Sequence, residues 1–321
     1  MTRAATLCLA VFFLAAGAAA EAADVEPPSA VVPNYKRVLI GQRAALEGMA
    51  YIARTDDPDA NWYNPAGLVR VGDTSLSASV SAFQVTVVEL RGDDVEESTQ
   101  SMSLVPSFLA GVTGPAEGAA RQQAFGYSVA MPVYMKQSID SDRYFSDATS
   151  SSEYIWNSRA DLETLAPGIA MAWKLSDNFS WGAGVRICRT ALESVSNSST
   201  HVIETATSNT IVLAEEEAIN AEIYHLRFSL GAQFRAGDHW EFGVNLRSPG
   251  IKLGDSGSFT IEGLANSPIG SLDVSTRLTD LEVNYMMPFE AGFGVAYSTD
   301  RWEVELDLTC HAGLGKFAVF K

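Results

Sequence analysis

The sequence predicts an all-β fold: a transmembrane antiparallel β-barrel, preceded by a compact irregular segment near the N-terminus. Three features indicate this fold. The chain opens with a stretch of small apolar residues, and an irregular segment, DDPDANWYNPAGL, follows at residues 56–68. From residue 75 onward, hydrophobicity then alternates with a period of two, which is the period of a β-strand.

The first twenty residues have the composition of a secretory signal peptide. Arg3 supplies a positive start, residues 4–20 are almost wholly apolar, and the alanines at 18–20 offer a small-residue cleavage site. A short run of this kind is typical of an exported chain rather than of a membrane anchor. We expect residues 1–20 to be removed, the mature chain to start within residues 21–23, and the protein to reach the bacterial outer membrane.

Composition narrows the classes of partner. Hydrophobic residues make up 47% of the chain, yet no run of eighteen apolar residues follows residue 20. The net charge of −17 argues against nucleic acid, because phosphate binding needs a basic surface. An acidic exported chain without a spanning helix can cross a membrane as a closed barrel. The expected partners are outer-membrane lipid and the outer-membrane assembly machinery, and the protein is expected to be a monomer.

The clearest strand lies at residues 222–236. Its apolar residues occupy every second position, and Arg227 and Arg235 fall between them. A helix would spread these arginines over all faces, whereas a strand places the apolar and polar sets on opposite sides. The apolar row consists of Tyr224, Leu226, Phe228, Leu230, Ala232, Phe234 and Ala236.

The same alternation recurs in roughly ten segments, many of them as long as the ~9–11 residues that a tilted strand needs to cross a bilayer. The rows run over residues 125–135, 165–175, 181–187, 240–246, 285–297 and 302–308. In the row at 285–297, Tyr285, Met287 and Phe289 are expected to face lipid and Asn284 to face inward.

Two features favour a membrane barrel over a secreted β-sandwich, which also alternates. The polar face is rich in Gly, Ala, Ser, Asn and Arg, as a crowded or wet lumen would favour. Aromatic residues also stand at the ends of segments, where the interfacial girdles of a barrel lie. These aromatic residues are Trp181, Trp240, Trp302, Tyr285 and Tyr297.

Turns and loops differ in length in the way expected of an outer-membrane barrel. The turns at 176–178 and 236–238 are short, whereas residues 139–160 and 191–220 are long polar stretches. We expect the short turns on the periplasmic side and the long stretches to be external loops.

The alternation also places Cys188 on the inner face and Cys310 on the lipid face, so no disulfide is expected between them.

The segment before the strands contains an ordered set of short motifs. A Gly-x-Arg-Ala opening at 41–44 is followed by small residues, an acidic pair and the string NPAGL at 64–68. This arrangement resembles the hatch of the FadL-type outer-membrane transporters, which move long-chain fatty acids and aromatic hydrocarbons. The resemblance extends, more weakly, from residue 38 to residue 308. The hatch motif consists of Gly41, Arg43, Gly48, Asp56, Asp57, Asn64, Pro65, Ala66 and Gly67.

The resemblance implies a signal peptide at 1–20, a hatch at 21–70, barrel strands and loops at 71–312 and an irregular tail at 313–321. It also implies passive movement of a hydrophobic small molecule through a plugged barrel, without cofactor, metal or catalysis. A plug inside a barrel must satisfy its polar groups by turns, and Asp57 and Asn64 can bond their own backbone in such turns.

Substrate contacts are expected from two groups of residues. Trp62 and Tyr63 of the hatch can meet an apolar substrate, or can simply pack the plug. A carboxylate head group would need a lumenal cation, and the inward-facing candidates are Arg186, Arg227, Arg235 and Arg247. The alternative for these arginines is an ion-pair lattice with Glu241, Glu303 and Asp307.

Two irregularities are visible. The apolar phase slips between Ala82 and Phe83, which predicts a bulge or kink in an early strand, or a strand end. In the family such a kink opens a side gate. The alternation also ends after Thr309, where the family's barrel of about fourteen strands would continue. We expect a truncated or frameshifted copy; strands recounted into a smaller closed barrel are the alternative.

Three other functions remain open from sequence. A general porin or a surface-exposed structural or antigenic barrel would share every strand signal but lack an apolar pocket. A soluble secreted β-sandwich would need no detergent. An enzyme is not expected, because the four histidines show no metal-ligand spacing and nothing else indicates a catalytic site.

Overall fold

The computed structural model describes residues 40–91, 95–113, 122–146, 149–204 and 207–314, with the backbone alone for 80–91 and 95–107. The expected signal peptide, the first part of the hatch (21–39) and all but the first two residues of the 313–321 tail lie outside these residues. In the described part of the chain, no helix is long and apolar enough to span a membrane.

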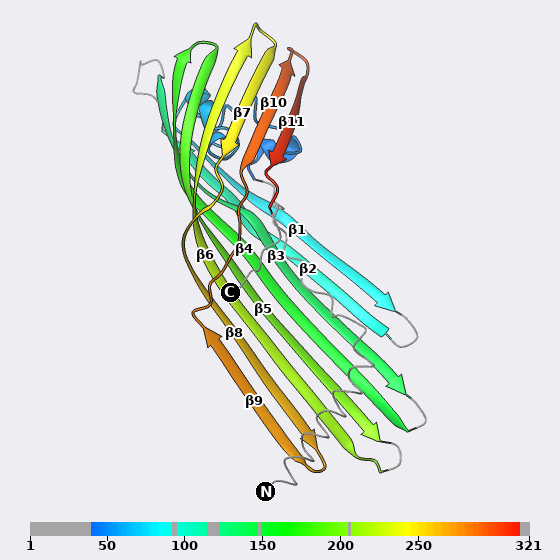
Figure 1. Ribbon diagram of the computed structural model, residues 1–321. Helices are drawn as coiled ribbons and strands as arrows, with labels where there is room; N and C mark the ends of the chain where they lie inside the picture. The colour runs from blue at the N-terminus through cyan, green and yellow to red at the C-terminus, as the bar shows by residue number, and fades with distance from the viewer. Residues whose placement is uncertain (1–39, 92–94, 114–121, 147–148, 205–206, 315–321) are drawn as a thin grey trace. The chain divides into compact units, whose positions relative to one another are not determined.

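The described chain forms one antiparallel sheet of eleven strands with short helices against it (Figure 1). The helices are α2 (Arg43–Leu46), α3 (Ala60–Tyr63) and the 3-10 helix η1 (Pro65–Arg70). The strands are β1 (Ser75–Arg91), β2 (Val95–Val112), β3 (Gln123–Ser146), β4 (Ser150–Ser176), β5 (Phe179–Glu204), β6 (Thr210–Ala236), β7 (Trp240–Arg247), β8 (Ile251–Ser267), β9 (Gly270–Thr279), β10 (Glu290–Ser298) and β11 (Glu303–His311).

Neighbours in the sequence are neighbours in the sheet from β1 to β7, and β10 and β11 follow β7. Strand β8 pairs with β6 and β9, so β7 and β8 occupy two successive lengths of β6, as Figure 1 shows. Among the described residues, the edge strands β1 and β11 do not pair with each other, so the sheet is open between them.

The two faces of the sheet follow the predicted alternation. In β6, Phe228, Leu230 and Phe234 are 46, 53 and 46% exposed, whereas Ser229 and Gln233 between them are 3 and 1% exposed. The outward row is therefore apolar and uncovered, and the inward row is buried against other parts of the chain. A soluble sandwich would bury the apolar row instead, so the burial pattern favours a surface that lipid covers.

The expected external loops at 139–160 and 191–220 are wrong: both regions are paired strands. The β3–β4 ladder runs on to Ser146↔Ser151, and the β5–β6 ladder to Ile203↔Thr210. Strands β3 to β6 have 24 to 27 residues, far more than the ~9–11 that cross a bilayer, so their distal halves extend beyond it. A strand with water on both faces needs no apolar row. These distal halves therefore show no period-two alternation in the sequence.

Short turns connect the other ends of these strands, as predicted. The β4–β5 turn lies at 177–178 and the β6–β7 turn at 237–239. Aromatic side chains gather at this end: the rings of Trp173 and Trp181 stack with centroids 4.5 Å apart, and those of Trp240 and Tyr297 lie 4.8 Å apart. This arrangement is the one expected of an interfacial girdle.

Interruptions of the ladders occur in two early strands. In β1 the register against β2 shifts between Ser81 and Gln84, which confirms the bulge predicted from the phase slip. Between β2 and β3 the ladder stops at Ser101↔Gln137 and resumes at Phe108↔Ala130. Six residues of each strand, all within the described backbone, therefore form no pair with the other strand. The two strands therefore lack ladder pairs over this length.

The predicted strand at 285–297 is only partly correct. Regular strand β10 begins at Glu290, and the residues before it are irregular. Tyr285 and Met287 pack against buried clusters rather than facing outward, whereas Phe289 is 39% exposed as expected.

The two cysteines lie as predicted, Cys188 buried and Cys310 exposed, and both are free.

Candidate transport site

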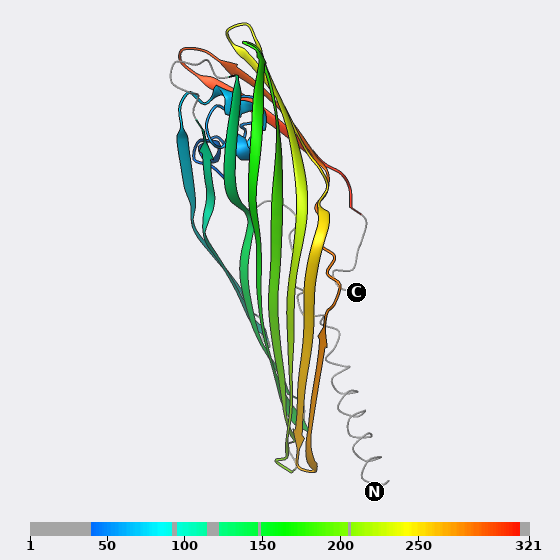
Figure 2. The ribbon, with the colours of Figure 1, turned by 90° about the vertical axis from the view of Figure 1, so that its left-hand side faces the viewer.

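The hatch packs against the inward face of the sheet, near the short turns (Figure 2). Its fold follows from its two prolines. Pro58 precedes the four-residue helix α3, and Pro65 occupies the first turn of η1, where a missing N–H has no cost. Asn64 between them is extended, with φ −156° and ψ 104°, as the residue before a proline prefers.

Asn64 joins three parts of the molecule through one fully buried side chain. Its Oδ1 accepts a hydrogen bond from the N–H of Ala66 at 3.2 Å, which confirms the predicted turn. Its Nδ2 donates to the carbonyl oxygens of Ile52 (2.9 Å) and of Ala232 in β6 (3.0 Å). The second predicted turn also forms, because the N–H of Asp59 donates to Asp57 Oδ1 at 2.9 Å.

Glycines of the wall allow the hatch backbone to approach the sheet closely. A Cβ atom on Gly231 of β6 would lie 2.1 Å from Asn64 Oδ1, and one on Gly243 of β7 would lie 2.3 Å from the carbonyl oxygen of Ile52. Gly182 of β5 lies under Pro65 in the same way. The small inward residues seen in the sequence are therefore the surface on which the hatch packs.

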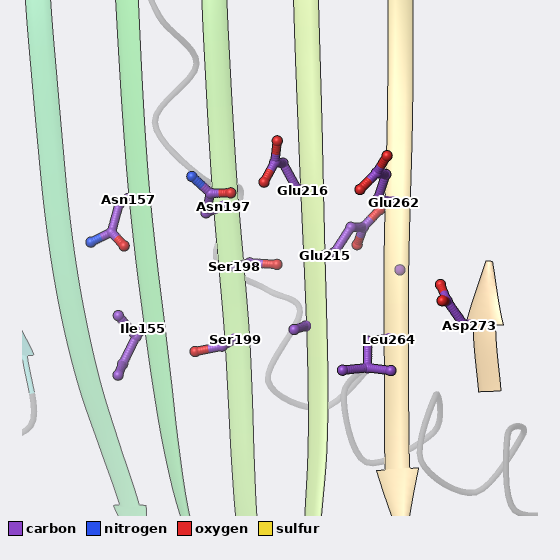
Figure 3. A pocket seen from close by; sticks show the side chains of 12 residues that line it. Ile155, Asn157, Asn197, Ser198, Ser199, Glu215, Glu216, Glu262, Leu264 and Asp273 are labelled. Carbon is purple, nitrogen blue, oxygen red and sulfur yellow. The ribbon is translucent and has the colours of Figure 1, made fainter. Parts of the chain in front are cut away.

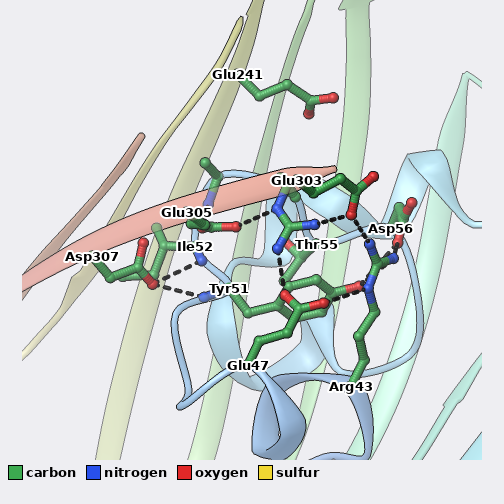
Figure 4. Close-up of polar contacts among 12 residues, drawn as sticks. Arg43, Glu47, Tyr51, Ile52, Thr55, Asp56, Glu241, Glu303, Glu305 and Asp307 are labelled. Atoms are coloured by element: carbon green, nitrogen blue, oxygen red, sulfur yellow. Dashed lines mark hydrogen bonds and ion pairs between the residues drawn. The ribbon is translucent and has the colours of Figure 1, made fainter. Parts of the chain in front are cut away.

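Strand β11 holds the hatch through charge (Figure 4). Arg54, only 7% exposed, places its Nε 2.8 Å from Glu305 Oε2 and also pairs with Glu303 and with Glu47 of the hatch. The other oxygen of Glu305 accepts a hydrogen bond from the N–H of Ala53 at 2.7 Å. Buried charges of this kind are stable only when paired and hydrogen-bonded on all sides.

Asp307 and Arg43 complete this network. Asp307 Oδ2 accepts the N–H groups of Tyr51 and Ile52 at 2.8 and 3.0 Å. Arg43, predicted from the hatch motif, pairs with Glu303 at 3.1 Å and with Asp56 at 3.1 Å. The hatch backbone is thus bound by successive inward side chains of one strand.

The acidic groups of the hatch are electrostatically perturbed. Burial, with a contribution from the charge of Asp59, raises the pKa of Asp57 to about 7. Burial also raises the pKa of Asp59 above its ordinary value. Removing a carboxylate from water disfavours its charged form, which is the direction of both shifts.

Trp62 lies between two arginines of the wall. The guanidinium carbons of Arg186 and Arg247 are each 5.0 Å from the centroid of its ring. Arg247 also pairs with Glu290, whose other oxygen lies 4.0 Å from Arg227. Arg186 is 6% exposed, and its Nε has no hydrogen-bond partner among the described residues. Two buried arginines and the half-buried Arg227 therefore lie around Glu290.

A small, partly open cavity of about 60 Å³ adjoins this cluster. Trp62, Val133, Cys188 and Met287 contribute apolar lining, and Arg227 and Glu290 the charged part; the rest of the lining is Pro132, Thr164, Tyr285, Met286, Pro288 and His311. The cavity therefore combines apolar walls with a cationic corner beside the hatch.

Two larger cavities have a different character. One of about 350 Å³ lies between the long hairpins, where Figure 3 shows Asn157, Asn197, Glu215, Glu216 and Glu262 around it. The other, about 660 Å³, adjoins Arg54 and the β10–β11 turn. Amide and carboxylate groups line the first cavity, and carboxylates and arginines line the second; such groups do not favour an apolar ligand.

The residues predicted as substrate contacts separate into two groups. Trp62 and Arg227 line the small cavity, and Arg247 lies beside it, over the ring of Trp62 and paired with Glu290. Tyr63 does not line it, because its ring is buried in the hatch and its hydroxyl donates to the carbonyl oxygen of Ile40 at 2.7 Å. Arg235 is exposed and pairs with Glu241 at 3.0 Å, away from the cavity.

Sequence reasoning missed Arg54, Glu305 and Glu290. The first two meet across a separation of 251 residues, which no local pattern reveals. Glu290 carried a signal, because in the sequence it alternates with the apolar residues of the row at 285–297. An inward acid next to three inward arginines would have identified the buried cluster.

The chain is similar to one protein family and to two solved structures. Residues 38–311 match the family described as outer membrane protein transport protein (OMPP1/FadL/TodX). A crystal structure of a Pseudomonas aeruginosa FadL homologue is 12% identical, with a TM-score of 0.39, over 86% of this chain and 90% of that one.

A second crystal structure, of the Pseudomonas putida toluene transporter TodX, is 13% identical, with a TM-score of 0.39, over 81% of this chain and 82% of that one. No curated protein matches the chain. The family match extends from the hatch through β11 and so includes every contact described above. The chain belongs to the OMPP1/FadL/TodX family of outer membrane transport proteins.

Proposed function

We propose that this protein carries hydrophobic small molecules, long-chain fatty acids or similar compounds, across the outer membrane by passive diffusion through the space beside its hatch. The driving force is the transfer of apolar surface out of water, ~25 cal/mol per Å² buried. No bond is made or broken, so the protein needs no cofactor. The proposal includes export through a cleaved signal peptide at 1–20, insertion by the outer-membrane assembly machinery, and function as a monomer.

One observation carries the proposal: the cavity beside Trp62 adjoins the stretch of β3 that does not pair with β2. Pro132 and Val133 line the cavity, and both belong to the six residues of β3 that do not pair with β2. A molecule in the cavity therefore has a short path into the lipid that covers the outer face. This supports lateral exit into the membrane rather than passage along the axis.

The arginine cluster supports a head-group contact for substrates that carry a carboxylate. Arg186 lacks an acceptor for its Nε, and Arg227 and Arg247 share one glutamate. Buried cations without a full set of acceptors are costly, and a carboxylate would supply the missing oxygen atoms. Trp62 would then contact the apolar part of the same molecule.

The direct test is uptake of a fluorescent dodecanoic acid by cells that lack their own transporter for it. Cells with this protein in the outer membrane should take up the probe faster than cells with an empty vector. Uptake no faster than the vector, with the protein confirmed in the outer-membrane fraction, would contradict the proposal. Planar-bilayer conductance separates it from a general porin, which would pass ions freely.

A further inference from the structure

Three arginines occupy neighbouring inward positions on three adjacent strands, and they are here called the arginine cluster. Arg186 of β5 and Arg227 of β6 are direct cross-strand partners. Arg247 of β7 stands opposite Ser229, the next inward residue of β6. Like charges that lie directly opposite each other destabilise a sheet. The cluster therefore needs negative charge close by.

One carboxylate supplies part of that charge. Glu290 is paired with Arg247, and its second oxygen lies 4.0 Å from Arg227 Nη2. In the part of the chain that the structure describes, no other carboxylate forms an ion pair with the cluster. Three guanidinium groups against one carboxylate leave two positive charges without a partner of opposite charge at ion-pair distance among those residues.

Hydrogen bonding leaves the same cluster short of acceptors. Arg227 donates its Nε and Nη2 to the carbonyl oxygens of Ser248 and Pro288, at 3.0 and 2.9 Å. The Nε atoms of Arg186 and Arg247 are buried and have no acceptor among the described residues. These two side chains are only 6 and 7% exposed, so bulk water does not supply the missing oxygen atoms. Buried cations of this kind are costly until an anion binds to them.

The ring of Trp62 stabilises the cluster without completing it. The guanidinium carbons of Arg186 and Arg247 both lie 5.0 Å from the centroid of that ring. Cation–π attraction at this distance favours the charged form of each arginine. An indole has no hydrogen-bond acceptor, however, so the ring leaves both Nε donors unsatisfied.

The cavity beside the cluster has room for a head group. Arg227 and Glu290 line it, and so does Cys188, which lies two positions along β5 from Arg186 on the same face. The cavity volume of about 60 Å³ exceeds the roughly 10–15 Å³ that one water molecule needs. Sites for whole small molecules are typically about 300 Å³ or larger. The cavity therefore fits a small anionic group, with the rest of a larger molecule outside it.

We propose that the arginine cluster is a site for a doubly charged anion, and that the preferred substrates are amphiphiles with a phosphate monoester head group. Such a head group would neutralise both uncompensated charges. Its three terminal oxygen atoms can accept hydrogen bonds from more than one guanidinium. A carboxylate neutralises only one of the two charges. The inference rests on the proposed function, because the cluster is taken as the head-group site of a transported molecule.

The test compares octyl phosphate with octyl sulfate, which has the same chain and a tetrahedral head group of single charge. At pH 8 the phosphate monoester carries close to two charges, because its second pKa is about 6. Binding to the purified protein in detergent is measured by isothermal titration calorimetry, with detergent alone as the blank. We expect octyl phosphate to bind roughly tenfold tighter or more, the effect of one further charge-assisted hydrogen bond. Equal affinity for the two ligands would overturn the proposal.

Variants assign the preference to the cluster. Arg186→Gln removes one uncompensated charge and should nearly abolish the preference for octyl phosphate, whereas Arg186→Lys should retain it. Arg235→Gln, at an exposed arginine outside the cavity, is the matched control and should behave like the unaltered protein. If Arg186→Gln fails to fold, Arg227→Gln at a less buried position gives the same comparison. A preference that survives the loss of either arginine would place the dianion elsewhere and overturn the proposal.

Three further outcomes distinguish the dianion site from the transport function. Inorganic phosphate that binds as tightly as octyl phosphate would support the dianion site and overturn its assignment to an amphiphile. Uptake of fluorescent dodecanoic acid by cells, combined with equal binding of the two octyl ligands, would support transport and overturn the dianion site. If cells take up no probe, the transport function fails, and the binding comparison on the purified protein decides the dianion site by itself.

Discussion

Arg54 Nε and Glu305 Oε2 lie 2.8 Å apart and join the hatch to the last strand of the sheet. Arg54 is 7% exposed, and the side chain of Glu305 is 1% exposed. Neither group can return to water while the hatch is docked. The pair therefore determines whether the hatch stays in place, since removing one partner leaves the other charge buried and unpaired.

We expect Arg54→Ala to lower the free energy of unfolding by about 3–5 kcal/mol, the usual cost of breaking a buried pair. The hatch should also become sensitive to protease. Denaturant unfolding in lipid vesicles and limited proteolysis measure the two effects. Arg301→Ala, which changes an exposed arginine near the same turn, is the matched control. Equal stability of the two variants would show that the pair does not hold the hatch.

The close approach of the hatch to the glycines of the wall leads to a second prediction, on the stability of glycine variants. Gly243→Ala would place a Cβ 2.3 Å from the carbonyl oxygen of Ile52. Overpacking of this kind costs about 1–3 kcal/mol of unfolding free energy. Gly263→Ala meets nothing closer than 4.0 Å and should change stability little. Thermal unfolding of both variants in the same detergent gives the comparison, and a neutral Gly243→Ala would contradict the contact.

Stability of the hatch should depend on pH through Asp57. Burial raises its pKa from 3.8 to about 7 in the folded protein. As the pH rises from 4 to 7, the unfolded carboxyl ionises while the folded one resists, so stability falls over this window and then levels off. Asp59 shifts in the same direction.

Hydrogen exchange of the hatch should therefore be slower at pH 5 than at pH 8, after correction for the intrinsic rate. Asp57→Asn should reduce this difference, and Asp73→Asn, at an exposed position, should leave it unchanged. A pH dependence that Asp57→Asn does not alter would assign the effect to other groups.

The arginine cluster predicts a preference between ligands of equal chain length. Arg186→Gln should weaken binding of palmitate roughly tenfold or more, because a charge-assisted hydrogen bond contributes about 1.5–3 kcal/mol, and should leave hexadecanol nearly unaffected. Arg235→Gln, whose ion pair with Glu241 lies outside the cavity, is the control. Equal losses for both ligands would indicate a structural role for Arg186 instead of a head-group contact.

Period-two alternation predicted the strands, and the orientation of their side chains, wherever one face of the sheet meets an apolar environment. Residues 224–236 are the clearest case, since each apolar residue there pointed outward as expected. The distal halves of the long hairpins could not be predicted from the same signal, because water on both faces imposes no alternation on residues such as Glu215 and Glu216.

The candidate site was predicted in part. The hatch motif located Asn64 and Arg43 because turns and their side-chain bonds are local in sequence. Arg54 and Glu305 are distant in sequence, and only the fold brings them together. Met287 shows a different limit: the alternation predicts an outward side chain, yet it packs against the buried cluster that contains Trp62.

Lipid contact of the outward rows is the central claim, and one measurement tests it directly. Spin labels would be placed singly at residues 224–230 of β6, in a cysteine-free protein reconstituted into vesicles. We predict high accessibility to oxygen at Tyr224, Leu226, Phe228 and Leu230, with low values between them. Uniformly low oxygen accessibility, or high accessibility of the same row to a water-soluble nickel complex, would contradict the membrane-spanning assignment.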